Sequence, residues 1–236
     1  MSDELPLEIT NGNSFYCTFA NMKILIVSAT QMEVDLAKEH LKDIYNIFFL
    51  VTGVGMLATA VSLTKYLSRN QPDLVIQVGI AGCFDQNTPL GSVVLVKEEI
   101  LGDLGVEEYG IWKDLFVIKL IDLDTPPFTK GMLLNQHLSK YNRLGLPTVT
   151  AITVNEITTR PPRILQQQLI YNPQIETMEG AALHYVCNDF YIPYLQIRGI
   201  SNYIGERDKT RWNIKDAVEN ANQLALDLIK SYEFDL

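Results

Sequence analysis

Short apolar segments that recur along the chain constrain its fold more than any other feature. The runs are residues 23–29, 48–52, 74–78, 92–96 and 194–200. Runs this short and this rich in Ile and Val are typical of strands that are buried on both faces. Between the second and third runs, residues 56–67 carry apolar side chains at helical spacing. This alternation of strand and helix predicts an α/β fold.

The end of the chain contains the clearest helical pattern. Apolar side chains recur from residue 214 to residue 228 with i, i+3, i+4 spacing, and Asn213 is placed to cap the first turn. Residues 103–147 have weaker periodicity, and we expect loops there with one edge strand or short helix. No repeat or flexible linker divides the chain, so residues 22–236 are expected to form one domain. Residues 1–21 begin acidic and polar, which is typical of an extension rather than a secretory signal.

Composition excludes several classes of function. The 236 residues carry a formal charge of −9, which argues against nucleic acid or an anionic membrane surface as the main partner. No run approaches the roughly 18 apolar residues of a membrane span. Cys17, Cys83 and Cys187 are widely spaced, which suits buried thiols in a reducing compartment. We therefore expect a cytoplasmic protein that needs no metal or organic cofactor.

Two glycine-containing segments follow predicted strands. Residues 52–55, Thr-Gly-Val-Gly, invite a dinucleotide-binding interpretation, but Ala58 occupies the third glycine position and Asp73 precedes a strand instead of ending one. A tight strand-to-helix turn is the simpler interpretation. Residues 79–82, Gly-Ile-Ala-Gly, are expected to form a loop whose backbone approaches a ligand. Ile80 is apolar, so this loop is poorly equipped to hold a phosphate.

Three segments that are far apart in the sequence carry the polar residues of greatest interest. They are residues 29–33, 176–182 and 198–202, and each follows or ends a predicted strand. In an open α/β sheet, ligands bind beyond the carboxyl ends of the strands. The sequence therefore predicts that the three segments meet at one pocket.

With their Met-Glu pair and their Arg-x-Ile-Ser-Asn motif, these segments resemble the nucleoside phosphorylase superfamily. The resemblance runs from about Met22 to the C-terminus and is nearest to the hydrolytic branch, the methylthioadenosine/adenosylhomocysteine nucleosidases and the futalosine hydrolases of the menaquinone pathway. The loop at 205–213 resembles futalosine hydrolases in particular. The resemblance implies a single-domain, three-layer αβα fold with a central mixed, twisted sheet. It also implies a purine nucleoside as the small-molecule partner and a homodimer or larger homo-oligomer.

The resemblance further implies roles for individual residues. Glu33 matches the acidic residue that orients and deprotonates the attacking water, and Arg198 matches an arginine near that water. Met178 and Glu179 match the pair that holds the ribose. These residue types suit cleavage of an N-glycosidic bond, since a carboxylate stabilises the cationic sugar and activates water. The alternative for both glutamates is a carboxylate in the first turn of a helix.

The base is expected to lie against a second group of residues. Ile157 and Thr158 fall where the family covers and contacts the base, and Ser201 and Gly82 are expected to line the same site. The adenine-specific nucleosidases carry Asp where this chain has Asn202. An Asn side chain can donate to a 6-oxo group or to N7, which favours a 6-oxopurine such as hypoxanthine, the base of futalosine. The alternative is an Asn that serves only a turn.

The loop at 205–213 suggests how a 5′ substituent could be held. Arg207 and Arg211 could clamp the carboxylate of futalosine's carboxyphenyl group, and Trp212 could cover its ring. A solvated, charged loop explains the same composition.

Three rival functions remain open. A phosphorolytic enzyme on the same fold is disfavoured by Ile80, and an adenine-specific nucleosidase is disfavoured by Asn202. A non-catalytic nucleoside-binding protein is disfavoured by the joint presence of Glu33, Glu179 and Arg198.

Overall fold

The structure is a computed structural model and describes residues 22–232. The predicted extension at residues 1–21, with Cys17, lies outside the described residues. The elements are β1 (Ile24–Ser28), α1 (Asp35–Leu41), β2 (Ile47–Val51), α2 (Met56–Leu67), β3 (Leu74–Cys83), β4 (Val93–Leu101), β5 (Gly105–Glu108), β6 (Ile111–Asp114), β7 (Leu133–Leu134), α3 (Leu138–Tyr141), β8 (Thr148–Thr153), α4 (Pro161–Tyr171), β9 (Ile175–Thr177), α5 (Gly180–Asp189), β10 (Tyr194–Tyr203) and α6 (Ile214–Ser231). Short 3₁₀ turns lie at Gln31–Glu33 and Lys209–Arg211.

The main sheet is mixed, as predicted. Its strands follow the order β10-β4-β8-β9-β3-β1-β2, with β7 paired to β4. β10 also pairs with β3, so the strands β3, β10, β4, β8 and β9 close into a ring. The β10–β4 and β3–β9 pairs are antiparallel, whereas the β1–β2, β1–β3 and β3–β10 pairs are parallel. β5 and β6 form a separate hairpin.

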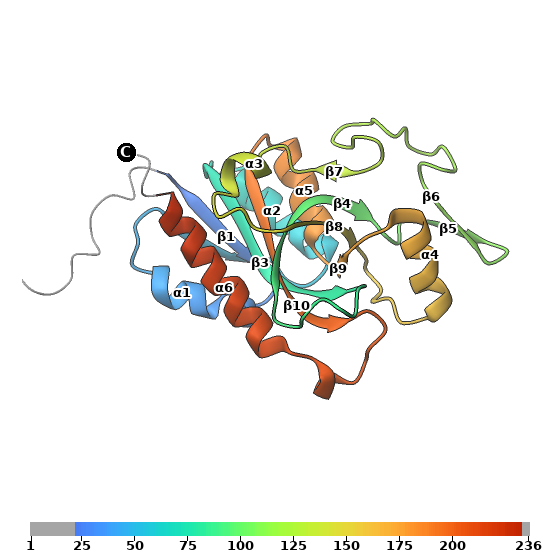
Figure 1. Ribbon diagram of the computed structural model, residues 1–236. Coiled ribbons are helices and arrows are strands. Elements are labelled where there is room, and N and C mark those ends of the chain that lie inside the picture. The colour runs from blue at the N-terminus through green and yellow to red at the C-terminus, as the bar shows by residue number, and fades with distance from the viewer. Residues whose placement is uncertain (1–21, 233–236) are drawn as a thin grey trace, which may run out of the picture.

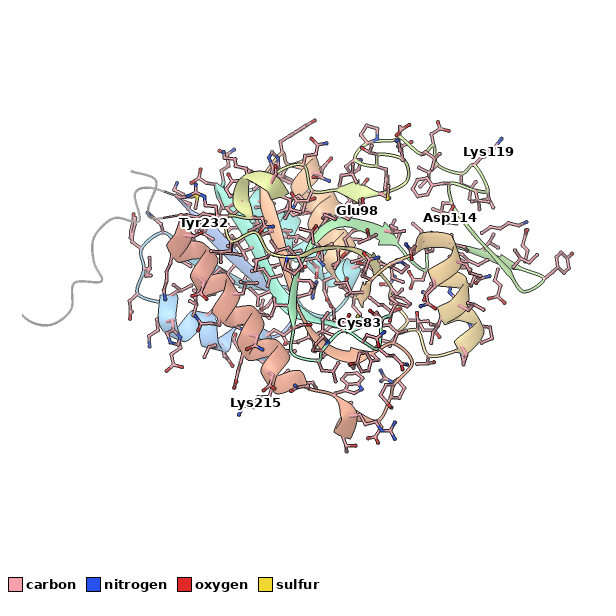
Figure 2. All side chains as sticks on the ribbon, in the orientation of Figure 1. Cys83, Glu98, Asp114, Lys119, Lys215 and Tyr232 are labelled. Atoms are coloured by element: carbon pink, nitrogen blue, oxygen red, sulfur yellow. The ribbon has the colours of Figure 1, made fainter. Side chains whose placement is uncertain are left out.

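Helices cover the sheet on both faces, which confirms the three-layer arrangement (Figure 1). The alternation of side chains along β1 shows how the layers form. Ile24 and Ile26 pack into the core under α1 and α6, while Leu25 and Val27 pack into the core under α2 and α5. This two-sided burial explains the uninterrupted apolar run at the start of the domain. Side chains fill the space between the layers (Figure 2).

The C-terminal helix has the predicted form. α6 begins after Asn213, whose Oδ1 accepts a hydrogen bond from Asp216 N. Its apolar face packs on β10 and β3, where Gly199 allows the helix to come close, because a Cβ at this position would lie 2.0 Å from Ala217 O. No helix within residues 22–232 has the length and apolarity that crossing a bilayer requires.

The structure corrects the prediction for residues 79–82, which are part of a strand. β3 continues through them to Cys83 because β10 pairs with it along its whole length. Gly79 is needed for packing, since a Cβ there would lie 2.4 Å from Arg198 Nη1. By contrast, Gly53 and Gly55 have φ values of 91° and 92° and form the strand-to-helix turn that the sequence predicts.

Other elements escaped the sequence analysis. β8 and α4 were not predicted, and residues 103–147 contain the β5–β6 hairpin, β7 and α3 instead of a single strand or helix. β8 reads Thr-Val-Thr-Ala-Ile-Thr, so polar hydroxyls interrupt its apolar pattern, although its β-branched residues favour a strand.

Replacing Gly199 with Ala tests the close approach of α6 to β10. The added methyl group meets a backbone carbonyl that cannot rotate away, so we expect a loss of about 3 kcal/mol in unfolding free energy, measured by urea denaturation. Gly110→Ala is the control, because no atom lies within 4 Å of its Cβ position and only its positive φ costs energy, about 1 kcal/mol. Equal losses in the two variants would contradict the packing argument.

Candidate active site

A cavity of about 250 Å³ brings most of the predicted site residues together. Those that line it are Glu33, Gly82, Ile157, Thr158, Met178, Glu179, Ser201, Asn202 and Trp212. The three predicted segments therefore meet at one cavity, but not because three strands end at the same edge of the sheet. β9 runs antiparallel to β3, so the segment after β9 reaches the cavity by running back along β3.

Glu33 ends the 3₁₀ turn after β1 and is nearly buried, with 6% of its surface exposed. Its Oε2 accepts hydrogen bonds from Thr30 N and Thr30 Oγ1, both at 2.9 Å. Its Oε1 accepts from Ile80 N at 3.3 Å, which directs that oxygen across β3. Asn222 of α6 fixes the turn from behind by donating to Glu33 O at 2.8 Å and accepting from Ala37 N at 3.0 Å.

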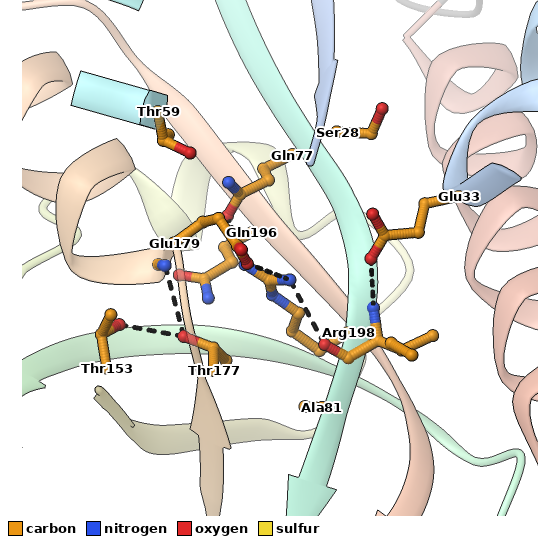
Figure 3. Close-up of polar contacts among 12 residues, drawn as sticks. Ser28, Glu33, Thr59, Gln77, Ala81, Thr153, Thr177, Glu179, Gln196 and Arg198 are labelled. Atoms are coloured by element: carbon orange, nitrogen blue, oxygen red, sulfur yellow. Dashed lines mark hydrogen bonds and ion pairs between the residues drawn. The ribbon is translucent and has the colours of Figure 1, made fainter. Parts of the chain in front are cut away.

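Arg198 is buried inside the ring of strands, with 1% of its surface exposed. Its Nη2 donates to Gln77 Oε1 at 2.7 Å, and its Nη1 donates to Ile80 O at 3.3 Å. Nη1 also lies 3.7 Å from Glu179 Oε2. Figure 3 shows the guanidinium lying between Glu179 and Glu33. Arg198 does not line the cavity itself, but it contacts Glu179 and Ile80, which do.

Glu179 is the N-cap residue of α5 and projects into the cavity. Its Oε1 accepts a hydrogen bond from Gly55 N at 2.9 Å, in the turn before α2. Burial raises the pKa of this carboxyl, and the positive charge of Arg198 opposes the rise. The carboxylate is held at two points on the protein side, which fixes its orientation in the cavity.

Asn202 lies where a β-bulge in β10 shifts the register between Ile200 and Asn202. Its Oδ1 accepts from Ser201 Oγ at 2.8 Å, and its Nδ2 donates to Tyr203 O at 3.1 Å. These partners engage one lone pair of the amide oxygen and one of its two N–H groups, and Ser201 Oγ also lies 3.2 Å from Ala81 O. The second N–H can donate to a ligand in the cavity.

The loop after β10 contributes only one of its three predicted residues to the cavity wall. Trp212 lines the cavity and donates from Nε1 to Glu206 O at 3.2 Å. The Arg207 guanidinium lies 5.4 Å from the centre of the Trp212 ring. Arg211 is exposed and pairs with Glu206 at 3.1 Å and Asp208 at 3.9 Å. Neither arginine is part of the cavity wall.

Two buried glutamates were missed by the sequence analysis. Glu176 lines the cavity, and its Oε1 accepts from Thr158 N at 3.1 Å. Glu99 of β4 lies inside the ring of strands with no exposed surface. Glu99 is the seventh residue of β4 and belongs to no recognisable motif, so no signal in the sequence pointed to it. Glu176 stood within the predicted segment at 176–182, three residues before Glu179, and its strand position was the available signal.

Glu99 organises the start of α5. It accepts hydrogen bonds from Gln196 Nε2 at 2.8 Å and Thr153 Oγ1 at 2.8 Å. Thr153 Oγ1 in turn accepts from Ala181 N at 2.8 Å, and a Cβ on Gly180 would collide with the Glu99 carboxylate. Glu99 thereby holds the helix terminus that carries Glu179.

Other features of the described residues lie away from this site. A larger, mainly apolar cavity of about 360 Å³, lined mostly by residues 100–132, contains none of the predicted residues. Among residues 22–232, no three His, Cys, Asp or Glu side chains gather in a way that could hold a metal ion. Cys83 and Cys187 are buried free thiols, and burial raises the pKa of Cys187.

Comparisons with known proteins agree with this fold. The family model of the phosphorylase superfamily matches residues 40–232. The futalosine hydrolase of Thermus thermophilus is 28% identical over 181 residues, which cover 72% of this chain and 75% of that protein. The 5′-methylthioadenosine/S-adenosylhomocysteine nucleosidase of Bacillus velezensis is 25% identical, covering 89% of this chain and 99% of its own.

Solved structures show the same fold. The 5′-methylthioadenosine/S-adenosylhomocysteine nucleosidase of Colwellia psychrerythraea, in complex with adenine, has a TM-score of 0.78 at 20% identity and covers 93% of this chain and 99% of its own. The futalosine hydrolase of Helicobacter pylori has a TM-score of 0.75 at 14% identity and covers 89% and 98%.

The chain therefore belongs to the phosphorylase superfamily. Its curated relatives are nucleosidases, which confirms the predicted class of enzyme, an N-glycosyl hydrolase.

Replacing Glu99 with Gln tests its buried charge through the pH dependence of stability. Burial raises the pKa of Glu99 from 4.5 to about 7. Between these values the folded protein retains a proton that the unfolded chain has lost, so the stability contribution of Glu99 falls as pH rises and is constant above pH 7. Relative to wild type, Glu99→Gln should gain about 3 kcal/mol across this window.

Urea unfolding at several pH values measures the difference between variant and wild type. Glu39→Gln on the exposed side of α1 is the matched control. A difference between Glu99→Gln and wild type that does not change with pH would contradict the assignment.

Proposed function

We propose that this chain is a hydrolase that cleaves the N-glycosidic bond of a 6-oxopurine nucleoside, with futalosine as substrate and hypoxanthine as the released base. The observation that carries the proposal is the orientation of Asn202. Its Oδ1 is engaged by Ser201 Oγ, so the amide offers a ligand an N–H group. A 6-oxo group or N7 accepts such a bond, whereas the 6-amino group of adenine requires an acceptor. Both kinds of nucleosidase occur among the relatives, so the choice between them depends on this residue.

The reaction uses the carboxylates of the cavity. As the C1′–N9 bond breaks, its electron pair moves to the purine and positive charge develops on the sugar. Glu179 accepts hydrogen bonds from the ribose hydroxyls, and Glu33 takes a proton from the water that attacks C1′. Asn202 stabilises the negative charge on the departing base by donating a hydrogen bond. One such donor is typically worth about 2.7–4 kcal/mol in the transition state.

Several features favour water over phosphate as the nucleophile. Phosphorolysis needs cationic or hydroxyl side chains that hold an anion next to the sugar. Ile80 supplies an apolar side chain here, and the guanidinium of Arg198 is occupied by Gln77 and the Ile80 carbonyl. Glu33 places a carboxylate in the same region, which repels an anion and suits the deprotonation of water.

The reaction is tested by incubating the protein with futalosine, inosine or 5′-methylthioadenosine, with and without phosphate, and separating the released bases by chromatography. We expect hypoxanthine from futalosine in phosphate-free buffer. A strict requirement for phosphate would identify a phosphorylase instead. Faster release of adenine than of hypoxanthine would contradict the assignment of the base.

The same assay tests the role of Glu33. Glu33→Gln keeps an oxygen to accept from Thr30 but cannot take a proton from water, so kcat should fall by about 100-fold or more. Asp35→Asn, two residues further along the chain but exposed, is the matched control. Thermal unfolding of both variants checks that each remains folded.

We also propose that Arg207 contributes to recognition of the 5′ substituent. It lies beside Trp212, which lines the cavity, so a small movement brings its charge to a carboxylate at the cavity mouth. Arg207→Ala should raise KM for futalosine about 3- to 10-fold and leave KM for inosine unchanged, because inosine has no carboxyphenyl group. Arg211→Ala is the matched control, since Glu206 and Asp208 already hold this arginine. Equal effects of Arg207→Ala on both substrates would exclude the role.

A further inference from the structure

One wall of the cavity carries a polar atom that has no partner. Glu176 is 6% exposed and lines the cavity. Its Oε1 is engaged by Thr158 N, but its buried Oε2 has no hydrogen-bond partner. A buried carboxylate oxygen without a donor is destabilising, because the water it loses on folding is not replaced. The cost is recovered if a ligand in the cavity supplies the missing donor.

The strand register shows where this oxygen lies relative to Asn202. Gly82 of β3 is paired with Asn202 of β10 on one side and with Glu176 of β9 on the other. Paired residues of neighbouring strands project from the same face of a sheet, and these three strands lie side by side (Figure 1). Since strands are roughly 4.8 Å apart, the Cα atoms of Asn202 and Glu176 are separated by about 10 Å.

Gly82 leaves room for an apolar side chain between Asn202 and Glu176. A Cβ at Gly82 would lie 2.6 Å from Ile204 Cδ1 and 3.3 Å from Asn202 Nδ2. The glycine therefore lets the Ile204 side chain lie over the strand, between Asn202 and Glu176. Ile204 and Ile157 both line the cavity, so a planar base has apolar contacts as well as polar groups at two of its edges.

We propose that the Glu176 carboxylate accepts a hydrogen bond from N1–H of a 6-oxopurine base, while Asn202 donates to the opposite part of the same base. This assignment rests on the proposed function and identifies a second residue that determines its specificity. Hypoxanthine carries a hydrogen on N1, which matches a carboxylate. Adenine has a lone pair on N1, which repels it. Asn202 and Glu176 would then discriminate against adenine at two separate atoms.

The experiment compares binding of free hypoxanthine and free adenine to wild type and to Glu176→Gln by calorimetry. In the variant, Oε1 still accepts from Thr158 N, but an NH₂ group replaces the unpartnered oxygen. Hypoxanthine should lose affinity by roughly 10- to 100-fold while adenine gains, so that the preference between the bases is reversed. Glu156→Gln, an exposed residue of the loop before α4 that lines a neighbouring polar cavity, should change neither affinity.

A change in the ligand provides the same test without a change in the protein. In 1-deazahypoxanthine a C–H group replaces N1–H within the same outline, so wild type should bind it roughly 10- to 100-fold more weakly than hypoxanthine. Should Glu176→Gln fail to fold, this comparison still decides the question. Equal affinity of wild type for hypoxanthine and its 1-deaza analogue would overturn the assignment.

The outcomes separate this inference from the proposed reaction, because binding of free bases requires no turnover. If wild type cleaves futalosine but Glu176→Gln weakens both bases equally, Glu176 only supports the Thr158 backbone and the inference fails. If the base preference reverses but no 6-oxopurine nucleoside is cleaved, the inference stands and the proposed reaction fails.

Discussion

The buried guanidinium of Arg198 is the interaction on which the rest of the site depends. A charge inside a ring of strands needs compensating partners, and removing one partner of a buried pair typically costs about 3–5 kcal/mol. Here Gln77, the Ile80 carbonyl and the Glu179 carboxylate contact the two terminal nitrogens of the guanidinium, whereas its buried Nε has no hydrogen-bond partner among the described residues. Gly79 is a glycine because this arrangement leaves no space for a Cβ.

The buried carboxyl group of Glu99 extends this arrangement to the helix that carries Glu179. Glu99 accepts from Gln196 and from the hydroxyl of Thr153, and that hydroxyl accepts in turn from the first turn of α5. The interior of the ring therefore holds this polar network as well as an apolar cluster around Ala81, Cys83 and Ile200. The position of the Glu179 carboxylate therefore depends on contacts that are buried inside the protein.

The sequence predicted those parts of the fold in which a single periodic pattern dominates. The uninterrupted run at β1 and the amphipathic pattern of α6 are examples, because two-sided and one-sided burial leave distinct patterns. β8 and the strand at residues 79–82 were missed because polar threonines in β8 and glycines in β3 interrupt the apolar pattern from which strands are predicted. Glu176 was missed because its role depends on the register between β9 and β3, which no local pattern encodes.

The contact between Asn222 and the turn that carries Glu33 has a consequence for the order in which the protein matures. The two residues are 189 positions apart, and α6 follows every other helix and strand of residues 22–232 along the chain. The backbone of the turn acquires its support from Asn222 only once α6 has been synthesised. A nascent chain that contains β1, β3 and β9 but not yet α6 thus lacks the contact that holds the turn of Glu33 in place.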